Sequence, residues 1–435
     1  MNLMPLKNHL QKGPFLLLAL IIFILPATGQ EEVPASEIFG DDLLMTEVNP
    51  LNSFGIFTLN TPFYIGSFKA KGNKFSVENS FGNTWHPKST VFYPQNMTSE
   101  QQQEANSLYI TQRPDYFKLN EIATQQKTFS TDGVLQNLSL TYLMQMGKKG
   151  SFIFKLNSHL LSGGSSVLHY LASDKFIEKF HTMVDLEDNF GRKVFDFDQA
   201  HILYRDENGR QIRIEKGDAF LGTLDVNYYK PIWQKEKRAS YYSAQLGAHL
   251  ALPLNNFYPK VSGGLSASLL FRKKIFPRFY ADVAGDFSLS HYALLGFGKS
   301  VNMIDRNIRI SAKTYLALNI VSKKNRAFCF GLVNNYQDAF LKGYIFSNSQ
   351  DEFQDLGVSY LQSGDIWEGA VLKGVVPLSK LTAASMYFFS IKSYLFLGFK
   401  VIKSDLMFTA GEDYLVVNNA PDIQFGVQYT RRFGW

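Results

Sequence analysis

The last fourteen residues of the chain, "DIQFGVQYTRRFGW" (residues 422–435), carry the pattern that decides the fold. From Ile423 to Trp435 every second residue is apolar, with the single exception of Arg431, and the residues between them are polar or small. Successive side chains of a β-strand point to opposite faces, so this stretch predicts a strand with one apolar and one polar side. The apolar side must face either a protein core or a lipid.

The same alternation recurs along the chain from residue 73 onward. It is clearest in "YYSAQLGAHLAL" (241–252) and "VSGGLSASLLF" (261–271). The pattern predicts about fourteen antiparallel strands, four of them in the less regular region 366–416. That region also fits an interpretation with two strands fewer, so a count of twelve stays open. Strands of roughly ten residues or more match the length that a tilted strand needs to cross a bilayer.

The connectors between these strands alternate in length. Short basic turns, such as "GKKG" (147–150) and "SKKNR" (322–326), fall at every second junction, and three long loops span residues 83–133, 162–217 and 337–365. A soluble β-sandwich also alternates in sequence, but long strands, loops that alternate by side and an aromatic end on the last strand favour a transmembrane barrel. Lipid offers no hydrogen bonds, so a spanning sheet must close on itself. We therefore expect an all-β, antiparallel, up-and-down transmembrane β-barrel.

The N-terminus has the pattern of an export signal. Lys7 and Lys12 precede the apolar run "FLLLALIIFIL" (15–25), and small residues follow it, which predicts a signal peptide over residues 1–29. Removing its two lysines changes the formal net charge from +6 to +4. So weak and dispersed a charge argues against a nucleic-acid partner. Cys329 is the only cysteine and makes no internal disulfide.

The final strand resembles the C-terminal signal by which the insertion machinery recognises the outer-membrane barrels of Gram-negative bacteria. This resemblance implies export to the outer membrane, with outer-membrane lipid and the barrel-assembly machinery as partners. "NPLNSFGIFTLNTPF" (49–63) and "LNSHLLSGGSSVLHYLASDKFIEKFH" (156–181) also resemble an uncharacterised family of predicted outer-membrane barrels, which implies location and fold but no activity. The residues that carry the insertion signal are Phe425, Val427, Tyr429, Phe433 and Trp435.

Two segments are candidates for filling the barrel, because a barrel this wide leaves space inside. Residues 166–184 have an amphipathic helical pattern and lie in a long outer loop. This helix either packs on the barrel mouth or folds into the lumen as a plug or gate. The segment 30–72, which precedes the barrel at 73–435, is the second plug candidate. The residues on the apolar side of the helix include Leu168, Leu171, Phe176, Ile177 and Phe180.

The polar faces of the strands predict the lining of the lumen. Acidic and basic residues occur on neighbouring strands, so a mixed interior is expected. Its charges either form structural ion pairs or select a class of solute. The residues assigned to the lumen are Glu78, Lys155, Asn157, His159, Asp225, Gln245, His249, Asp282, Asp286, Arg309 and Lys313.

Catalytic and metal sites are not expected from the sequence. His159 and Ser162 lie three residues apart, and residues at that spacing in a strand point to opposite faces. The eight histidines show no spacing that selects a metal, and no cofactor is indicated. The favoured function is therefore a channel or uptake protein for a small solute of unknown identity. The alternatives are a binding or structural protein that uses its long loops, such as "VFDFDQAHILY" (194–204), and, least favoured, a lipid-modifying enzyme.

Overall fold

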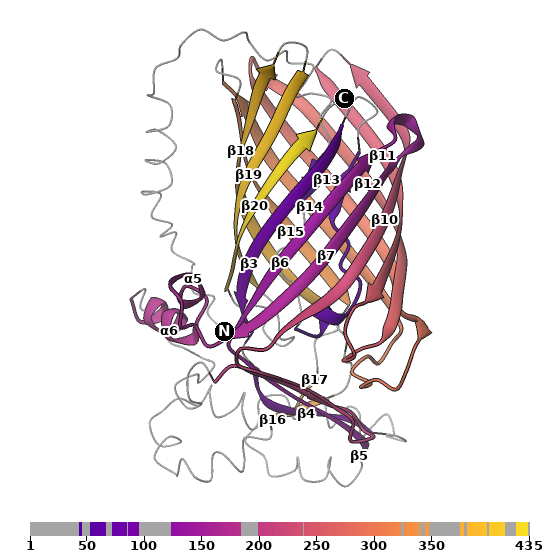
Figure 1. Cartoon of the computed structure of the whole chain (residues 1–435), viewed down its shortest axis with the longest axis vertical. Coiled ribbons are helices and arrows are strands. Elements are labelled where there is room, and N and C mark those ends of the chain that lie inside the picture. Colours follow the sequence, from indigo (N-terminus) through magenta and orange to yellow (C-terminus); the bar gives the residue numbers. More distant parts are fainter. Residues whose placement is uncertain are drawn as a thin grey trace, which may run out of the picture.

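The computed structural model describes residues 43–45, 53–66, 72–84, 86–94, 123–183, 199–237, 239–322, 326–338, 340, 344–347, 375–377, 381–397, 400–413 and 423–433. These residues form a closed barrel of antiparallel strands, ordered β10-β11-β12-β13-β14-β15-β18-β19-β20-β3-β6-β7 (Figure 1). The bounds are β3 (Asn73–Asn83), β6 (Val134–Gln145), β7 (Ser151–Ser162), β10 (Ala219–Lys237), β11 (Ser240–Pro253), β12 (Lys260–Phe276), β13 (Phe279–Gly296), β14 (Ile308–Val321), β15 (Arg326–Asp338), β18 (Leu381–Leu397), β19 (Lys400–Asp413) and β20 (Ile423–Phe433).

The all-β barrel predicted from the sequence is confirmed. The closed ring has twelve strands, the lower of the two counts that the sequence allows. Within its described residues, the region 366–416 contributes two barrel strands, β18 and β19, and each of them is longer than the short alternating runs suggest. Residues 366–374, where a further strand was expected, lie outside the described residues. The ring closes where the last strand, β20, pairs with the first barrel strand, β3, with Tyr429 opposite Val77. Every strand of the barrel thus has a neighbour on both sides, and no edge of this sheet is left unpaired.

Burial alternates along each strand of the barrel. On β12, Leu265 and Leu269 are 65% and 64% exposed, whereas Ser266 and Ser268 between them are 6% and 1% exposed. Large apolar side chains thus cover the outside, and small or polar side chains occupy most inward positions. A continuous exposed apolar surface of this kind is unfavourable in water and is typical of a barrel surrounded by lipid.

Short turns join the strands at the end where the chain terminates (Figure 1). One of them, η2 (Gly147–Lys149), joins β6 to β7 and ends at Gly150. Gly150 has φ of 121°, and a Cβ atom there would lie 2.4 Å from the carbonyl oxygen of Tyr229. Only glycine adopts this conformation in the available space, so the turn depends on it.

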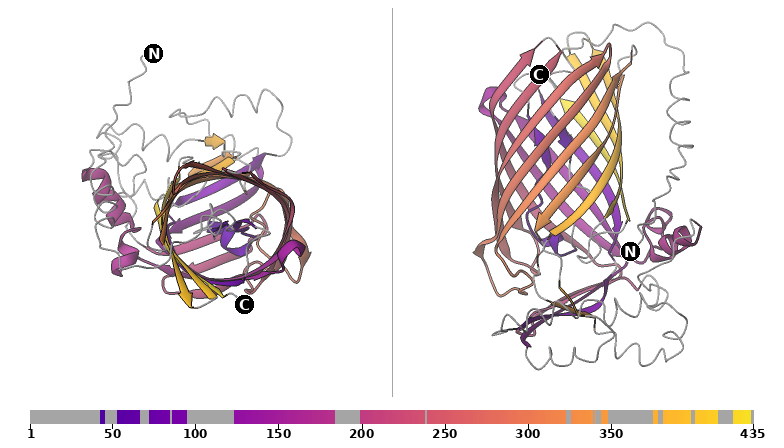
Figure 2. Two further views of the ribbon diagram at one scale, coloured as in Figure 1. Left: turned by 90° about the horizontal axis from the view of Figure 1, so that it is seen from above. Right: turned by 180° about the vertical axis from the view of Figure 1, so that it is seen from behind.

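The opposite end of the barrel carries a second sheet, ordered β17-β16-β4-β5-β8-β9. Figure 1 and the right view of Figure 2 place it beyond the ends of the barrel strands. Most of its strands come from the segments expected as long loops, and this sheet was not predicted. The bounds are β4 (His86–Pro94), β5 (Ala123–Asp132), β8 (His201–Arg205), β9 (Gln211–Glu215), β16 (Tyr344–Ser347) and β17 (Val375–Pro377).

The chain before the first barrel strand runs through the ring. The short helix η1 (Ser53–Phe57) appears inside the circle of strands when the barrel is seen end-on (Figure 2). The segment continues into β2 (Phe63–Ile65), which pairs with β1 (Leu43–Met45). The helices α5 (Val167–Tyr170) and α6 (Asp174–Met183) lie beside the barrel near the end that carries the second sheet (Figures 1 and 2).

Among the described residues, no helix has the length and apolar character needed to cross a membrane.

Candidate functional site

The polar residues assigned to the lumen all have buried side chains. They occupy strand positions that alternate with exposed apolar residues, so they lie on the inner side of the wall. Whether they select a solute stays a prediction. These residues are Glu78, Lys155, Asn157, His159, Asp225, Gln245, His249, Asp282, Asp286, Arg309 and Lys313.

The lumen is occupied by residues 53–66, which we call the plug. Two basic side chains of β14 hold its backbone: Arg309 Nη2 donates a hydrogen bond to the carbonyl oxygen of Leu59 at 3.0 Å, and Lys313 Nζ donates to that of Thr61 at 2.5 Å. The plug is irregular here, so its carbonyl groups have no strand partner and require donors from the wall. Of the two plug candidates in the sequence, the segment 30–72 therefore contributes the one inside the barrel.

Uncharged side chains of β10 and β11 also hold the plug backbone. Gln245 accepts a hydrogen bond from the backbone N–H of Gly66 at 2.7 Å and donates one to the carbonyl oxygen of Tyr64. The hydroxyl of Tyr229 donates to the carbonyl oxygen of Pro62 at 2.9 Å. Most of these hydrogen bonds are made with backbone atoms of the plug rather than with its side chains.

The outer end of the plug is anchored by aromatic packing. Phe54 is buried, and its ring meets those of Phe57, Tyr204, Tyr258 and Phe340 edge-to-face, with centroids 5.3–5.7 Å apart. Tyr204 belongs to β8 of the second sheet, so this cluster joins the plug to the sheet that lies beyond the barrel mouth. The same apolar core includes Ile202, Ile212 and Ile214 of that sheet.

The inner end of the plug contacts an apolar part of the wall. The ring of Phe63 stacks on Tyr315 with centroids 5.6 Å apart, and Tyr315 stacks on Phe388 at 5.3 Å. The sequence predicted a polar lumen throughout, and this region differs because several inward positions of β12–β19 hold apolar residues. They include Leu270, Ala284, Ala317, Cys329 and Met407.

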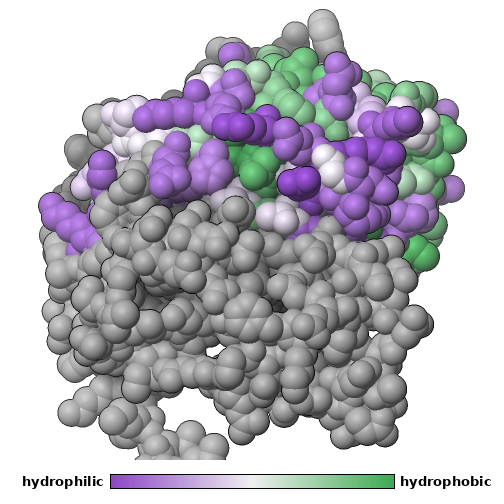
Figure 3. Space-filling view, turned by 90° about the horizontal axis from the view of Figure 1, so that it is seen from below, coloured by the Kyte–Doolittle hydropathy of each residue, from purple (hydrophilic) through white to green (hydrophobic). Residues whose placement is uncertain are grey.

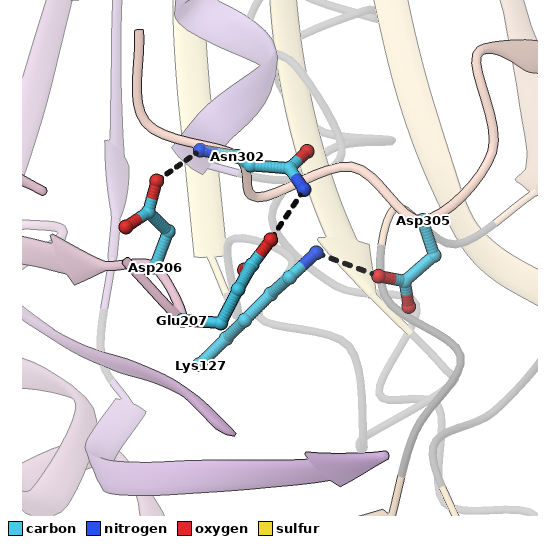
Figure 4. A network of polar contacts seen from close by, with 5 residues as sticks. All are labelled: Lys127, Asp206, Glu207, Asn302 and Asp305. Atoms are coloured by element: carbon cyan, nitrogen blue, oxygen red, sulfur yellow. Dashed lines mark hydrogen bonds and ion pairs between the residues drawn. The ribbon is translucent and has the colours of Figure 1, made fainter. Parts of the chain in front are cut away.

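Polar contacts connect the second sheet to the loop that follows β13 (Figure 4). Lys127 of β5 forms an ion pair with Asp305 at 2.8 Å. The backbone N–H of Asn302 donates to Asp206 at 3.0 Å, and its side chain donates to Glu207 at 2.8 Å. The second sheet is thereby fixed to the barrel by charged contacts as well as by its apolar core.

The helix proposed as a plug or gate lies outside the lumen, so that interpretation is corrected. His169 of α5 hydrogen-bonds Gln136, whose side chain shares the outward face of β6 with the exposed Leu138 and Leu140. The amphipathic pattern therefore reflects docking against the outside of the barrel, the other interpretation of the sequence. Of the apolar residues expected to act, Ile177 is buried and Leu171 and Phe176 are half-buried, while the side chains of Leu168 and Phe180 lie outside the described residues.

The start of α6 is held by a hydrogen bond from Asn83 to Asp174, whose carboxyl group also lies beside that of Asp132. Asn83 donates hydrogen bonds to Asp174 at 2.9 Å and to the carbonyl oxygen of Ala172 at 3.2 Å. Burial, together with the hydrogen bond and charge of the adjacent Asp174, raises the pKa of Asp132 to about 8, despite the hydrogen bond from the backbone of Gln199. The second sheet and α6 therefore meet at a carboxyl group that holds a proton at neutral pH.

The docking of α6 is expected to weaken as the pH rises. The pKa of Asp132 is raised from the ordinary value of 3.8 to about 8 in the fold. Between pH 3.8 and pH 8, the folded chain therefore binds more protons at this carboxyl group than the unfolded chain does. Its contribution is then fully present below pH 3.8 and is lost as the pH rises through 8. We expect hydrogen exchange of residues 174–183 to be faster at pH 9 than at pH 6, after correction for the intrinsic rate. Asp132→Asn should remove this dependence, whereas Glu215→Gln on the exposed edge strand β9 should not. An unchanged pH dependence in Asp132→Asn would contradict this assignment.

The C-terminal strand presents its apolar residues outward. Val427, Tyr429 and Phe433 are exposed, and Phe425 packs against Phe81 of β3 with ring centroids 5.8 Å apart. Trp435 lies outside the described residues. Recognition of this strand by an insertion machinery stays a prediction.

Several polar side chains of the wall have buried atoms without a hydrogen bond within the described part of the chain, and three of them lie close together in sequence register on β7 and β10. These three are the Lys155 ammonium, both ring nitrogens of His159, and one carboxylate oxygen of Asp225. Asp225 and Lys155 are directly opposite each other on neighbouring strands. Within the same residues, no group of three or more His, Cys, Asp or Glu is placed to hold a metal ion.

Comparison with known proteins gives distant structural likenesses. No family model and no curated protein matches the sequence. An outer membrane channel from Pseudomonas putida F1 aligns with 10% identity and a TM-score of 0.34, covering 89% of this chain and 100% of that one. LpxR from Salmonella typhimurium aligns with 8% identity and a TM-score of 0.34, covering 83% and 100%. A FadL homologue from Pseudomonas aeruginosa aligns with 6% identity and a TM-score of 0.31, covering 83% and 89%. At these values the likenesses carry no argument about function.

Proposed function

We propose that the chain is an outer-membrane channel or uptake protein for a small solute, closed by its own N-terminal plug. The observation that carries this proposal is the position of residues 53–66, which lie inside a closed barrel and are held by side chains of its wall. The exposed apolar belt and the export signal support a location in the outer membrane. Membership in the uncharacterised barrel family stays a prediction.

The contacts of the plug favour a removable segment over a permanent core. A hydrogen bond that can be exchanged for one with water contributes only about 0.5–1.5 kcal/mol, or about 1.5–3 kcal/mol when one partner is charged. The polar middle of the plug is held by such bonds from Arg309, Lys313 and Tyr229. Movement of this part therefore costs far less than unfolding the barrel, whose strands are all paired.

The contacts of the plug also indicate the class of solute. Arg309 and Lys313 donate to carbonyl oxygens of the plug, and the ring of Phe63 covers an apolar wall at Tyr315. A molecule that takes the place of the plug meets hydrogen-bond donors and an apolar surface side by side. This combination fits a small solute that carries both an acceptor group and an apolar part.

Binding of a partner at the outer end is the second candidate function. The described part of this end is largely hydrophilic, with apolar side chains toward its rim (Figure 3). The edge strand β9 exposes Gln211, Arg213 and Glu215 while burying Ile212 and Ile214. An exposed edge with alternating charges is available for contact with another molecule.

Conductance in planar bilayers tests the proposal. The intact chain should be closed for most of the time, and deletion of residues 53–66 should give a permanently conducting barrel. Because the deletion variant has its own folding risk, the double variant Arg309→Met, Lys313→Met provides a second measure. Loss of two charged hydrogen bonds to the plug should raise the ratio of open to closed states about 10²- to 10⁴-fold.

Arg213→Met, on the exposed strand β9, is the matched control and should leave conductance unchanged. Folding of each variant is checked by the heat-dependent mobility of the barrel in detergent electrophoresis. A folded barrel that stays silent without residues 53–66 contradicts the channel and favours the surface-binding function.

A further inference from the structure

A chain of hydrogen bonds lies on the outside of the barrel wall, where the rest of the surface is mainly apolar. The hydroxyl of Ser162 lies 2.7 Å from His169 Nδ1, and His169 Nε2 lies 3.0 Å from Gln136 Oε1. The amide nitrogen of Gln136 then donates to Asn79 Oδ1 at 2.7 Å. Each contact has the length of a good hydrogen bond.

The fold brings these four residues together from distant parts of the sequence. Asn79, Gln136 and Ser162 occupy outward positions on the neighbouring strands β3, β6 and β7, close to their outer ends. Ser162 is the last residue of β7, and Gly163 and Gly164 then turn the chain into α5. This turn places His169 back over the outer face of β6.

The donors and acceptors along this chain of hydrogen bonds determine which ring nitrogen of His169 carries the proton. Because the Gln136 amide nitrogen donates to Asn79, its oxygen is the atom that faces His169. That oxygen accepts, so His169 Nε2 carries the proton and Nδ1 has a free lone pair for the hydroxyl of Ser162. Burial lowers the pKa of His169, which keeps the imidazole neutral at pH 7. A neutral imidazole whose lone pair accepts from a serine hydroxyl is arranged as a general base.

We propose that Ser162 and His169, positioned by Gln136, form a hydrolytic site for acyl esters of membrane lipids. Nucleophile, base and orienting group are recognised by their geometry and roles, irrespective of the fold that carries them. The three-residue spacing of His159 and Ser162 predicts that they point to opposite faces, and His159 is indeed buried on the inner side of the wall. His169 supplies the base from a different element.

The surroundings of Ser162 match a lipid substrate. Leu138 on β6 and Leu221 on β10 are exposed on the same outer surface, 44% and 46% respectively, where an acyl chain can lie along them. Within the described residues, the backbone N–H groups of Gly163 and Gly164 make no hydrogen bond. These two groups directly follow the serine and are suited to stabilise the oxyanion of the reaction.

The reaction proceeds in two balanced steps. Ser162 Oγ attacks the ester carbonyl carbon while its proton passes to His169 Nδ1. The C–O bond to the alcohol then breaks, the proton moves from Nδ1 to the leaving oxygen, and an acyl-serine remains. In the second step water attacks the acyl-serine, His169 accepts a proton from that water, and the proton returns to Ser162 Oγ as the fatty acid leaves. No cofactor or oxidant is required.

The test uses the full chain in detergent micelles and in vesicles, with a fluorophosphonate reagent that labels activated serines. Mass spectrometry should find the label on Ser162. Release of fatty acid is measured in two arms, vesicles of phosphatidylethanolamine and vesicles containing lipopolysaccharide, which separate the two sources of acyl ester. Ser162→Ala should abolish labelling and hydrolysis, and His169→Ala should slow both about 10²- to 10⁴-fold.

Ser158→Ala is the matched control, because Ser158 also lies on the outer face of β7 and donates to the carbonyl oxygen of Leu138. It should retain full labelling. Gln136 is a positioning residue: Gln136→Leu should reduce the rate, and Gln136→Glu should restore it with the pH profile moved to higher pH, since a carboxylate favours the charged imidazole. The proposal is overturned if the folded chain is not labelled at Ser162 and releases fatty acid in neither arm. The hydrogen bonds would then serve only to dock α5 on the barrel.

Discussion

Replacing Phe54 by alanine is expected to release the outer end of the plug while leaving the barrel folded. Phe54 is 1% exposed and makes edge-to-face contacts with four aromatic rings, among them Tyr204 of the second sheet. Truncation of a buried phenylalanine costs about 3–5 kcal/mol, which includes the loss of such ring contacts. The barrel strands are held by their own ladders of hydrogen bonds. The lost free energy therefore destabilises the plug and its contact with the second sheet, and not the barrel.

Hydrogen exchange of residues 53–66 measures this effect directly. A local loss of about 3–5 kcal/mol corresponds to exchange faster by about 100-fold or more, because each 1.4 kcal/mol is a factor of ten. Phe287→Ala is the control, since Phe287 is 53% exposed on the outer face of β13 and has no contact with the plug cluster. If Phe54→Ala leaves the exchange of the plug unchanged, the aromatic cluster is not what anchors it.

The barrel was predictable because period-two alternation assigns each residue to a face without any knowledge of its partners. On β11, Gln245 and His249 are buried, whereas Leu246 and Leu250 are exposed, as the alternation indicates. The second sheet was missed for the opposite reason. Its strands β8 and β9 have five residues each and lie inside a segment expected as one long loop. Their place is fixed by burial of Ile202 and Tyr204 against the plug, a contact between distant segments.

The candidate sites also combine features that a local sequence pattern predicts with contacts between distant segments that it does not predict. An amphipathic pattern states that α6 has an apolar side, but not whether that side contacts the lumen or the outer wall. The hydrogen bonds that His169 of the adjoining α5 makes with Ser162 and Gln136 place these helices on the outer wall, and they join residues 7 and 33 positions apart. Likewise, the alternation gives the inward direction of Arg309 but not its partner, the carbonyl oxygen of Leu59, which lies 250 residues away. Such contacts depend on how separate segments meet in space, which no local pattern contains.

The ion pair between Arg272 and Asp282 is expected to make the largest single contribution of a charged contact to the stability of the wall. The two residues are directly opposite each other on β12 and β13, and the guanidinium donates two hydrogen bonds of 2.7 Å to the carboxylate. Both side chains are almost fully buried. Removing one member of a buried pair takes the direct partner from the other charge, which costs about 3–5 kcal/mol. Asp282→Ala should lower the free energy of unfolding in urea by that amount.

The double variant Arg272→Met, Asp282→Leu separates the penalty of an orphaned charge from the net value of the pair. Removing both charges also removes both desolvation costs, so apolar replacement of a buried pair is often neutral. The neighbouring inward residues Leu270 and Tyr280 are themselves apolar, and the new side chains have a surface to pack against. The double variant should therefore be more stable than Asp282→Ala by about 2 kcal/mol or more. Equal stability of the single variant and the unaltered chain would show that the charge of Arg272 is compensated elsewhere in the lumen.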